Sequence, residues 1–264
     1  MTRSLERLLA ICATLALLSG CSQVPVPVPV PLHWRKASLW ATASAEYAAV
    51  ALQTFAAARE KLDVALADPA WTARLEQSEG YESFPPAIVT DLDETVLDNR
   101  PFQRRLIREG LDFDEEMWNE WVRERRAKAI PGSLEFLLYV QERNVEIFYI
   151  TNRSHSVEEA TRANLAALGL PLNPEVDTVL AKNEREDWGS DKESRLAMIA
   201  GSYRVLLILG DHLRDFVSVE GFSRDERRKT TFDHAAMWGE KWFMLPNPLY
   251  GSWVGEPSAQ DPLE

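Results

Sequence analysis

Cysteine is almost absent from the chain, which has only two, Cys12 and Cys21, among its 264 residues. Two cysteines cannot form a disulfide framework or a four-cysteine zinc site, so apolar packing must hold the fold together. Basic residues are also few, because 29 Lys and Arg stand against 41 Asp and Glu and give a net charge of −12. This balance argues against binding to a nucleic-acid polymer, whose phosphates require clustered Lys and Arg.

The sequence also lacks a long hydrophobic run. The apolar stretch from Leu8 to Leu18 follows two arginines and is shorter than the roughly 20 residues of a membrane-spanning helix. Such a start is typical of a secretory signal, which we expect over residues 1–20. The following Leu18-Ser19-Gly20-Cys21 resembles the lipobox of bacterial lipoproteins. The resemblance implies a protein of the cell envelope that is lipid-anchored through Cys21, and Ser22 is compatible with the outer membrane.

Alternating valine and proline over residues 24–31 predict a stiff, extended spacer. We assign the spacer to residues 21–33 and one domain to residues 34–264. The segment 34–80 is rich in Ala, Leu and Glu and lacks Gly and Pro over its first half. It therefore predicts a long helix over residues 36–66 and a shorter helix after it.

Beyond the two adjacent prolines at 85 and 86, short apolar runs alternate with amphipathic segments. The runs that predict strands are residues 87–90, 145–151, 178–180 and 204–209. Capping patterns predict one helix from Ser156 and Glu159 to Gly169, and another from Ser190 and Glu193 to Gly201. Alternating strands and helices predict an α/β fold, a parallel sheet covered by helices, which binds ligands at the carboxyl ends of its strands.

Polar side chains gather at those strand ends. They are Asp91 and Asp93 after the first strand, Thr151 and Asn152 at the end of the second, Asp211 and Asp215 after the fourth, and Lys192 in the first turn of a helix. Carboxylates held close together need a cation or a proton between them. A lysine, a hydroxyl group and paired acids are the groups that magnesium-dependent phosphoryl transfer requires. Each pattern alone is common in turns, so the prediction depends on their occurring together.

Two motifs around these residues resemble those of a known family: I-V-T-D-L-D-E-T-V-L at residues 88–97 and G-D-H-L-R-D-F at residues 210–216. The family is the class C nonspecific acid phosphatases, bacterial and usually lipid-anchored members of the haloacid-dehalogenase-like superfamily. Further matches are W-N-E-W at 118–121, A-I-P-G at 129–132, Y-I-T-N-R at 149–153 and L-P-N-P-L-Y-G at 245–251. The resemblance implies a Rossmannoid parallel sheet with helices on both faces and a mainly helical cap. His212, Arg214 and Phe102 depart from the family pattern.

The resemblance also implies roles for the acids. Asp91 would be the nucleophile that forms an aspartyl-phosphate, and Asp93 would give a proton to the leaving group and then activate water. Mg²⁺ would be held by Asp91, Asp211 and the backbone carbonyl group of Asp93, with Asp215 behind them.

The remaining implied roles concern the substrate. Thr151, Asn152 and Lys192 would bind the phosphoryl oxygens, with Lys182 as the alternative lysine. The segment 102–126 is the expected cap insertion. Aromatic walls hold the leaving group in the family, and the matching residues are Trp118 and Tyr250. Trp118 could instead belong, with Trp121, to a stripe of core residues along a helix.

We therefore expect a metal-dependent acid phosphatase that hydrolyses phosphomonoesters, with nucleoside 5′-monophosphates and aryl phosphates as substrates. Asp93 disfavours a dehalogenase, which needs only the first aspartate, while a phosphomutase could use the same residues. The alternative from another class is a catalytically silent lipoprotein of the same fold that binds a ligand. The expected partners are a small phosphomonoester and the membrane, and a homodimer is left open.

Overall fold

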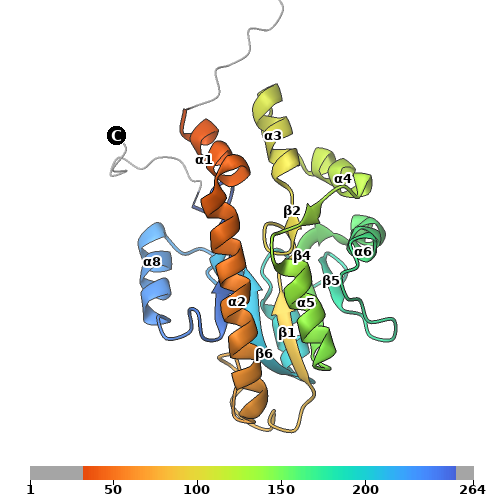
Figure 1. The fold of residues 1–264 in the computed structure, drawn as a ribbon, viewed down its shortest axis with the longest axis vertical. Helices are drawn as coiled ribbons and strands as arrows, with labels where there is room; N and C mark the ends of the chain where they lie inside the picture. Colours follow the sequence, from red (N-terminus) through yellow and green to blue (C-terminus); the bar gives the residue numbers. More distant parts are fainter. Residues whose placement is uncertain (1–31, 254–264) are drawn as a thin grey trace, which may run out of the picture.

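The computed structural model describes residues 32–253 (Figure 1). Five strands form a parallel sheet in the order β5-β4-β1-β6-β7. They are β1 (Pro86–Thr90), β4 (Glu146–Ser154), β5 (Val179–Lys182), β6 (Arg204–Gly210) and β7 (Trp242–Met244). A small antiparallel pair consists of β2 (Leu97–Asp98) and β3 (Lys128–Ala129). The four predicted strands are confirmed, whereas β2, β3 and β7, each two or three residues long, were not predicted.

The helices are α1 (Leu32–Ala43), α2 (Ala45–Ala67), α3 (Arg100–Glu109), α4 (Glu115–Glu124), α5 (Ser133–Glu142), α6 (Glu158–Ala167), α7 (Glu193–Ala200) and α8 (Arg224–Asp233). Figure 1 shows α2 and α5 side by side on one face of the sheet. Successive side chains of a strand point to opposite faces, so Ile88 packs in the cluster of α2 and α5 while Val89 packs in the cluster of α7. Helices therefore cover both faces, and the predicted α/β fold is confirmed.

The predicted long helix over residues 36–66 is two helices, because Ser44 interrupts it. Ser44 has extended backbone angles, and its hydroxyl group accepts a hydrogen bond from the amide of Tyr47 at 3.1 Å, which caps α2. The shorter helix predicted before residue 80 is wrong. Residues 68–85 form turns and bends instead, and the indole of Trp71 in this segment donates to the carbonyl oxygen of Leu206 in β6 at 2.8 Å.

The two predicted capping boxes are also wrong, although both helix ends are confirmed. At residues 156–159, the cap is the hydroxyl group of Ser154, which accepts from the amide of residue 156 at the start of a short 3₁₀-helix. At residues 190–193, Asp191 accepts from the amide of Glu193 at 2.7 Å. The ends are Gly169, which has φ +74°, and Gly201.

Helices α1, α3 and α4 lie together at one end of the sheet, above the carboxyl ends of the strands (Figure 1). Arg100 at the start of α3 links this helix to α1 and β2, because its guanidinium group binds Asp98 of β2 at 2.6 Å and also donates to the backbone oxygen of Ala41 in α1. The predicted cap insertion, 102–126, thus contains most of α3 and all of α4.

The predicted signal peptide, Cys21 and most of the spacer lie outside the described residues. Within residues 32–253, no helix is both long enough and apolar enough to cross a membrane. The helix α1 already begins at Leu32, two residues before the predicted start of the domain.

Candidate active site

Three carboxyl groups meet at the carboxyl ends of the two central strands. Asp91 directly follows β1, Asp211 directly follows β6, and Asp215 ends a short 3₁₀-helix after it. Oxygen atoms from these three side chains lie within 4.8 Å of one another. Gly210 permits this approach, since a Cβ atom at this residue would lie 2.3 Å from Oδ2 of Asp215. The acids predicted from two separate motifs are therefore brought together.

Lys192 connects two of these acids. Its ammonium group lies 2.5 Å from Oδ1 of Asp91 and 2.6 Å from Oδ1 of Asp215, and its side chain is buried. Burial lowers the pKa of Lys192, but the charges of Asp215 and Asp91 outweigh that effect and raise the pKa above its usual range. The lysine is thus held as a cation beside Asp91.

One ammonium group does not neutralise three carboxylates. Burial raises the pKa of Asp91 to about 7, against the opposing effect of Lys192. Burial and the neighbouring Asp91 and Asp215 also raise the pKa of Asp211 well above its usual value. Burial is the main cause of both shifts and the neighbouring carboxylates add to it, so a dication would favour the ionised acids. Carboxylate oxygens are the donors that hard divalent cations prefer, so the group could hold a metal ion.

The side chain of Asp93 binds other partners than the side chains of Asp91, Asp211 and Asp215 do. Arg153, almost fully buried, donates to Oδ1 of Asp93 from Nε at 2.9 Å and from Nη2 at 2.7 Å. Asn99 donates to the same oxygen at 2.8 Å, and Thr151 donates to Oδ2 at 3.4 Å. The carboxyl group of Asp93 is therefore turned toward β4 and is not part of the group formed by Asp91, Asp211 and Asp215.

Thr151 and Asn152 lie in β4, which extends past the predicted end of the strand. The amide of Asn152 donates to the carbonyl oxygen of Ser190 at 3.0 Å and accepts from Arg195 at 3.1 Å. Asn152 thus ties β4 to the loop that carries Lys192. The alternative lysine, Lys182, lines the same cavity as Asp91.

A cavity of about 810 Å³ is lined by the four acids and Lys192, together with Asn152 and Lys182. Trp118 and Tyr250, the predicted aromatic walls, both line it, and both pack partly against the core. The hydroxyl group of Tyr250 donates to Oε2 of Glu94. Glu94 has a positive φ of 60° and is buried. Burial raises the pKa of this glutamate to about 8.

Of the residues that depart from the family pattern, His212 and Phe102 have side-chain partners in the structure. Nε2 of His212 lies 2.7 Å from the hydroxyl group of Ser252, and burial lowers the pKa of His212. Phe102 packs edge to face against Trp118, with ring centroids 5.1 Å apart. Arg214 lines the cavity. The cation that lies between two of the acids is Lys192.

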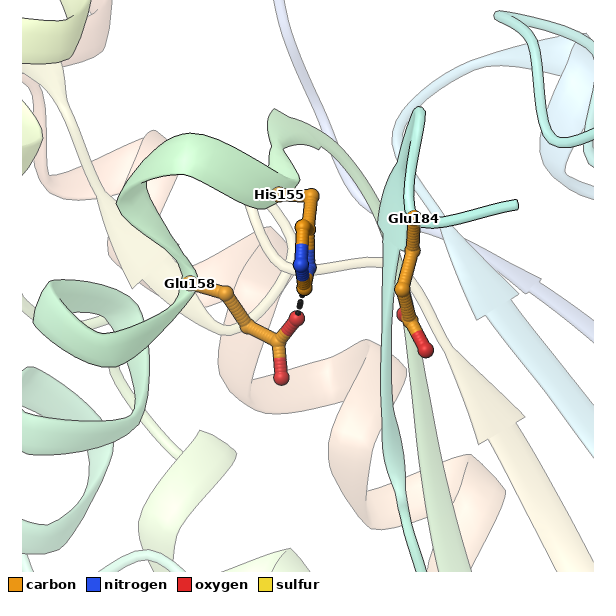
Figure 2. A group of neighbouring side chains, drawn as sticks. All are labelled: His155, Glu158 and Glu184. Atoms are coloured by element: carbon orange, nitrogen blue, oxygen red, sulfur yellow. Dashed lines mark hydrogen bonds and ion pairs between the residues drawn. The ribbon is translucent and has the colours of Figure 1, made fainter. Parts of the chain in front are cut away.

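A second group of carboxyl and imidazole side chains lies where β4 and β5 end (Figure 2). Figure 2 shows His155 and Glu158 joined by a hydrogen bond, which measures 2.7 Å, with Glu184 on the neighbouring segment. The other oxygen of Glu158 accepts from Arg162 at 2.6 Å, and Glu184 accepts from the amide of Ala181 at 3.1 Å. Hydrogen bonds within the protein thus already engage both carboxylates.

Several side chains that hold the acids were not predicted from the sequence. They are Arg153 and Asn99 on Asp93, Thr95 on Asp91 at 3.2 Å, and Asn247 on Asp211 at 2.7 Å. Arg153 and Asn247 lie inside motifs that carried the family resemblance, yet no role was assigned to them. Alternation along β4 was the available signal for Arg153, because residues two apart on a strand share a face.

Comparison with known proteins identifies the family. Residues 3–253 match the family model described as HAD superfamily, subfamily IIIB (acid phosphatase). The class C acid phosphatase from Bacillus anthracis is 34% identical, with a TM-score of 0.73, over 83% of this chain and 86% of that one. The same Bacillus anthracis enzyme with tungstate bound gives 34% identity and a TM-score of 0.72, over 84% and 87% of the two chains. The chain therefore belongs to subfamily IIIB of the haloacid-dehalogenase superfamily, the acid phosphatases, and the predicted family is confirmed.

More distant relatives come from plants. Acid phosphatase 1 of Solanum lycopersicum is 27% identical over 179 residues, which are 61% of this chain and 57% of that protein. The stem 28 kDa glycoprotein of Glycine max is 25% identical over 167 residues, which are 61% of this chain and 58% of that protein. The chain thus spans less than two thirds of the length of these relatives.

Proposed function

We propose that the protein is a metal-dependent acid phosphatase that hydrolyses phosphomonoesters, nucleoside 5′-monophosphates and aryl phosphates among them. The observation that carries the proposal is the meeting of Asp91, Asp211 and Asp215 around Lys192 in one cavity. The family match supports the reaction class, and the likeness to an acid phosphatase that binds tungstate supports a site for a tetrahedral oxyanion.

Asp91 is the nucleophile in this proposal. An oxygen atom of its carboxylate forms a bond to phosphorus, and the bond from phosphorus to the alcohol oxygen breaks. Asp93 supplies the proton that the departing oxygen takes up. In the second half of the reaction Asp93 removes a proton from water, the water oxygen attacks phosphorus, and phosphate leaves Asp91. Arg153 and Asn99 hold Asp93 where it can serve in both steps.

The phosphoryl group needs positive charge around it, because its oxygens carry charge throughout the reaction. Lys192 supplies part of that charge, and its contact with Asp91 favours it over Lys182 as the phosphate-binding lysine. The hydroxyl group of Thr151 and the amide of Asn152 are the proposed uncharged partners.

The residues present fit Mg²⁺, which would be held by Asp91, Asp211 and the backbone carbonyl group of Asp93, with Asp215 beside them. When bound, this ion would neutralise charge on the phosphoryl oxygens. Asn247 orients Asp211 for this role through its hydrogen bond to Oδ2 at 2.7 Å.

We also propose that the protein is a lipoprotein of the cell envelope, anchored in the outer membrane through Cys21. The lipobox-like sequence before Cys21 supports the anchor, and Ser22 is compatible with the outer membrane. Labelling of cells with a radioactive fatty acid tests the lipid anchor at Cys21. Label in the full chain that is absent from Cys21→Ala supports the anchor, and equal label in both contradicts it.

The activity is tested by phosphate release from nucleoside monophosphates and an aryl phosphate, with the purified full chain, between about pH 4.5 and 7.5. Each assay is run with Mg²⁺ and with chelator. We expect metal-dependent release that Asp91→Asn abolishes and that the matched variant Asp187→Asn, at an exposed site, retains. Ligand binding without release would favour the silent lipoprotein, and release unchanged in Asp91→Asn would contradict the nucleophile.

A further inference from the structure

The cavity extends well beyond the acids. Its far side is formed by side chains from α1, α3, α4 and the connection between the last two, which we call the apolar wall: Trp34, Leu106, Ile107, Leu111, Phe113 and Trp118. The same cavity is lined by Asp91 and Lys192. A molecule whose phosphate lies at Asp91 would therefore extend its alcohol part along this wall.

Part of the wall is exposed apolar surface. Phe113 is 62% exposed and Leu111 is 45% exposed. Both lie between α3 and α4, at the mouth of a cavity that also contains the acids. Exposed apolar side chains that line a cavity are typical of a ligand-binding surface, because a ligand covers them.

The rings of the wall are poorly arranged for stacking on a flat base. Trp118 has the edge of Phe102 against it, and the guanidinium group of Arg153 lies 5.6 Å from its ring centroid. The ring of Phe113 is inclined at 45° to Trp118, with centroids 6.5 Å apart. A base between two rings requires nearly parallel faces. A flexible aliphatic chain has no such requirement, and three of the wall residues are aliphatic.

We propose that the apolar wall binds the alkyl chain of an amphiphilic phosphomonoester, whose phosphate is hydrolysed at Asp91. The inference rests on the proposed phosphatase activity and adds a substrate class to it. The reaction is the same hydrolysis: water cleaves the ester bond and releases a long-chain alcohol and phosphate.

The start of α1 adds a second argument. Trp34 lies in the first turn of α1, which begins at Leu32, eleven positions after Cys21 in the sequence. Eleven residues span at most about 40 Å. With Cys21 acylated as proposed above, the wall lies within that reach of a bilayer, where single-chain phosphate esters collect.

The test compares ethyl, butyl, hexyl and octyl phosphate, each dissolved as monomers, by phosphate release from the purified full chain. If the wall buries the chain, kcat/KM rises about two- to fourfold for each added methylene group. In Phe113→Ser and in Leu111→Ser, kcat/KM should rise less with each added methylene group than it does in the unmodified chain. Phe232→Ser is the matched control, because Phe232 on α8 is 71% exposed and lies outside the cavity lining.

A value of kcat/KM that does not depend on chain length would overturn the inference. An equal rise of kcat/KM per methylene group in Phe113→Ser and Phe232→Ser would overturn it as well. Failure of every ester, ethyl phosphate included, would instead contradict the phosphatase activity itself. A further comparison uses dodecyl phosphate in phosphatidylcholine vesicles. Release from the vesicles would support a membrane source for the substrate, and release only from dissolved esters would support a soluble source. Both results support the alkyl class.

Discussion

The guanidinium group of Arg153 holds the carboxyl group of Asp93 through two nitrogen atoms, Nε at 2.9 Å and Nη2 at 2.7 Å from Oδ1. A lysine keeps the charge but cannot make this two-pronged contact. We therefore expect Arg153→Lys to lower kcat roughly tenfold or more, since Asp93 loses its orientation for proton transfer. The loss should be larger for an alkyl phosphate than for p-nitrophenyl phosphate, whose leaving group needs less protonation. Equal losses on both esters would contradict the role of Asp93 as proton donor.

Addition of Mg²⁺ should stabilise the protein if the acids hold the ion. At about one hundred times the dissociation constant we expect Tm to rise by roughly 5–10 °C. Asp211→Asn removes one of the three carboxylates and should abolish most of this rise, whereas Asp187→Asn should leave it intact. Differential scanning fluorimetry with Mg²⁺ or with chelator measures the Tm of the unmodified chain and of both variants. A rise of the same size in Asp211→Asn would rule out this site.

Gly210 is expected to tolerate no side chain. In Gly210→Ala the new Cβ atom would lie 2.3 Å from Oδ2 and 2.4 Å from Cβ of Asp215, so that side chain must move. We expect a loss of about 1–3 kcal/mol in the free energy of unfolding and a fall in kcat. Gly189→Ala is the matched control, because nothing lies within 4 Å of its Cβ position. Urea unfolding and phosphate release are measured for both variants. A free energy of unfolding and a kcat that are unchanged in Gly210→Ala would contradict the close approach of Asp215 to Gly210.

Glu94 should make stability depend on pH. Burial raises its pKa from 4.5 to about 8, so the folded chain keeps a proton that the unfolded chain loses in this interval. The free energy of unfolding should therefore fall as pH rises from 4.5 to 8, by up to about 1.4 kcal/mol per pH unit from this group.

The variant Glu94→Gln should flatten that dependence, and Glu82→Gln, at an exposed site, should not. Urea unfolding at several pH values, with chelator present, provides the measurement. If Glu94→Gln keeps the slope of the unmodified chain, the buried glutamate is not its source.

The acids could be predicted because their signal is local. Asp91 and Asp211 each come within two residues of a run of apolar residues, so the strand that positions each acid can be predicted from its neighbours in the sequence. Parallel strands then bring the two ends to one edge of the sheet. The contact between Arg153 and Asp93 has no such local signal. It depends on the pairing of β1 with β4, in which Thr90 lies opposite Tyr149.

The apolar wall could not be predicted for a similar reason. Trp34 and Phe113 are far apart in the sequence and line one cavity only because α1 and α3 are packed together above the strand ends. The division of the first helix was missed because Ala-rich sequence on both sides of Ser44 favours helix, and a single serine decides between continuation and a new start. The apolar wall thus depends on tertiary packing, whereas the division of the helix depends on a local cap.

The break at Ser44 divides one Ala-rich stretch of sequence into two helices with different surroundings. Residues after it, in α2, pack on the sheet and are constrained by the core, whereas Trp34 before it, in α1, lines the cavity. Mutations in α1 can therefore alter the fit of the alcohol part without disturbing the strands that hold the acids. Relatives that share the catalytic aspartates could diverge in substrate preference through this short helix, with little effect on the rest of the domain.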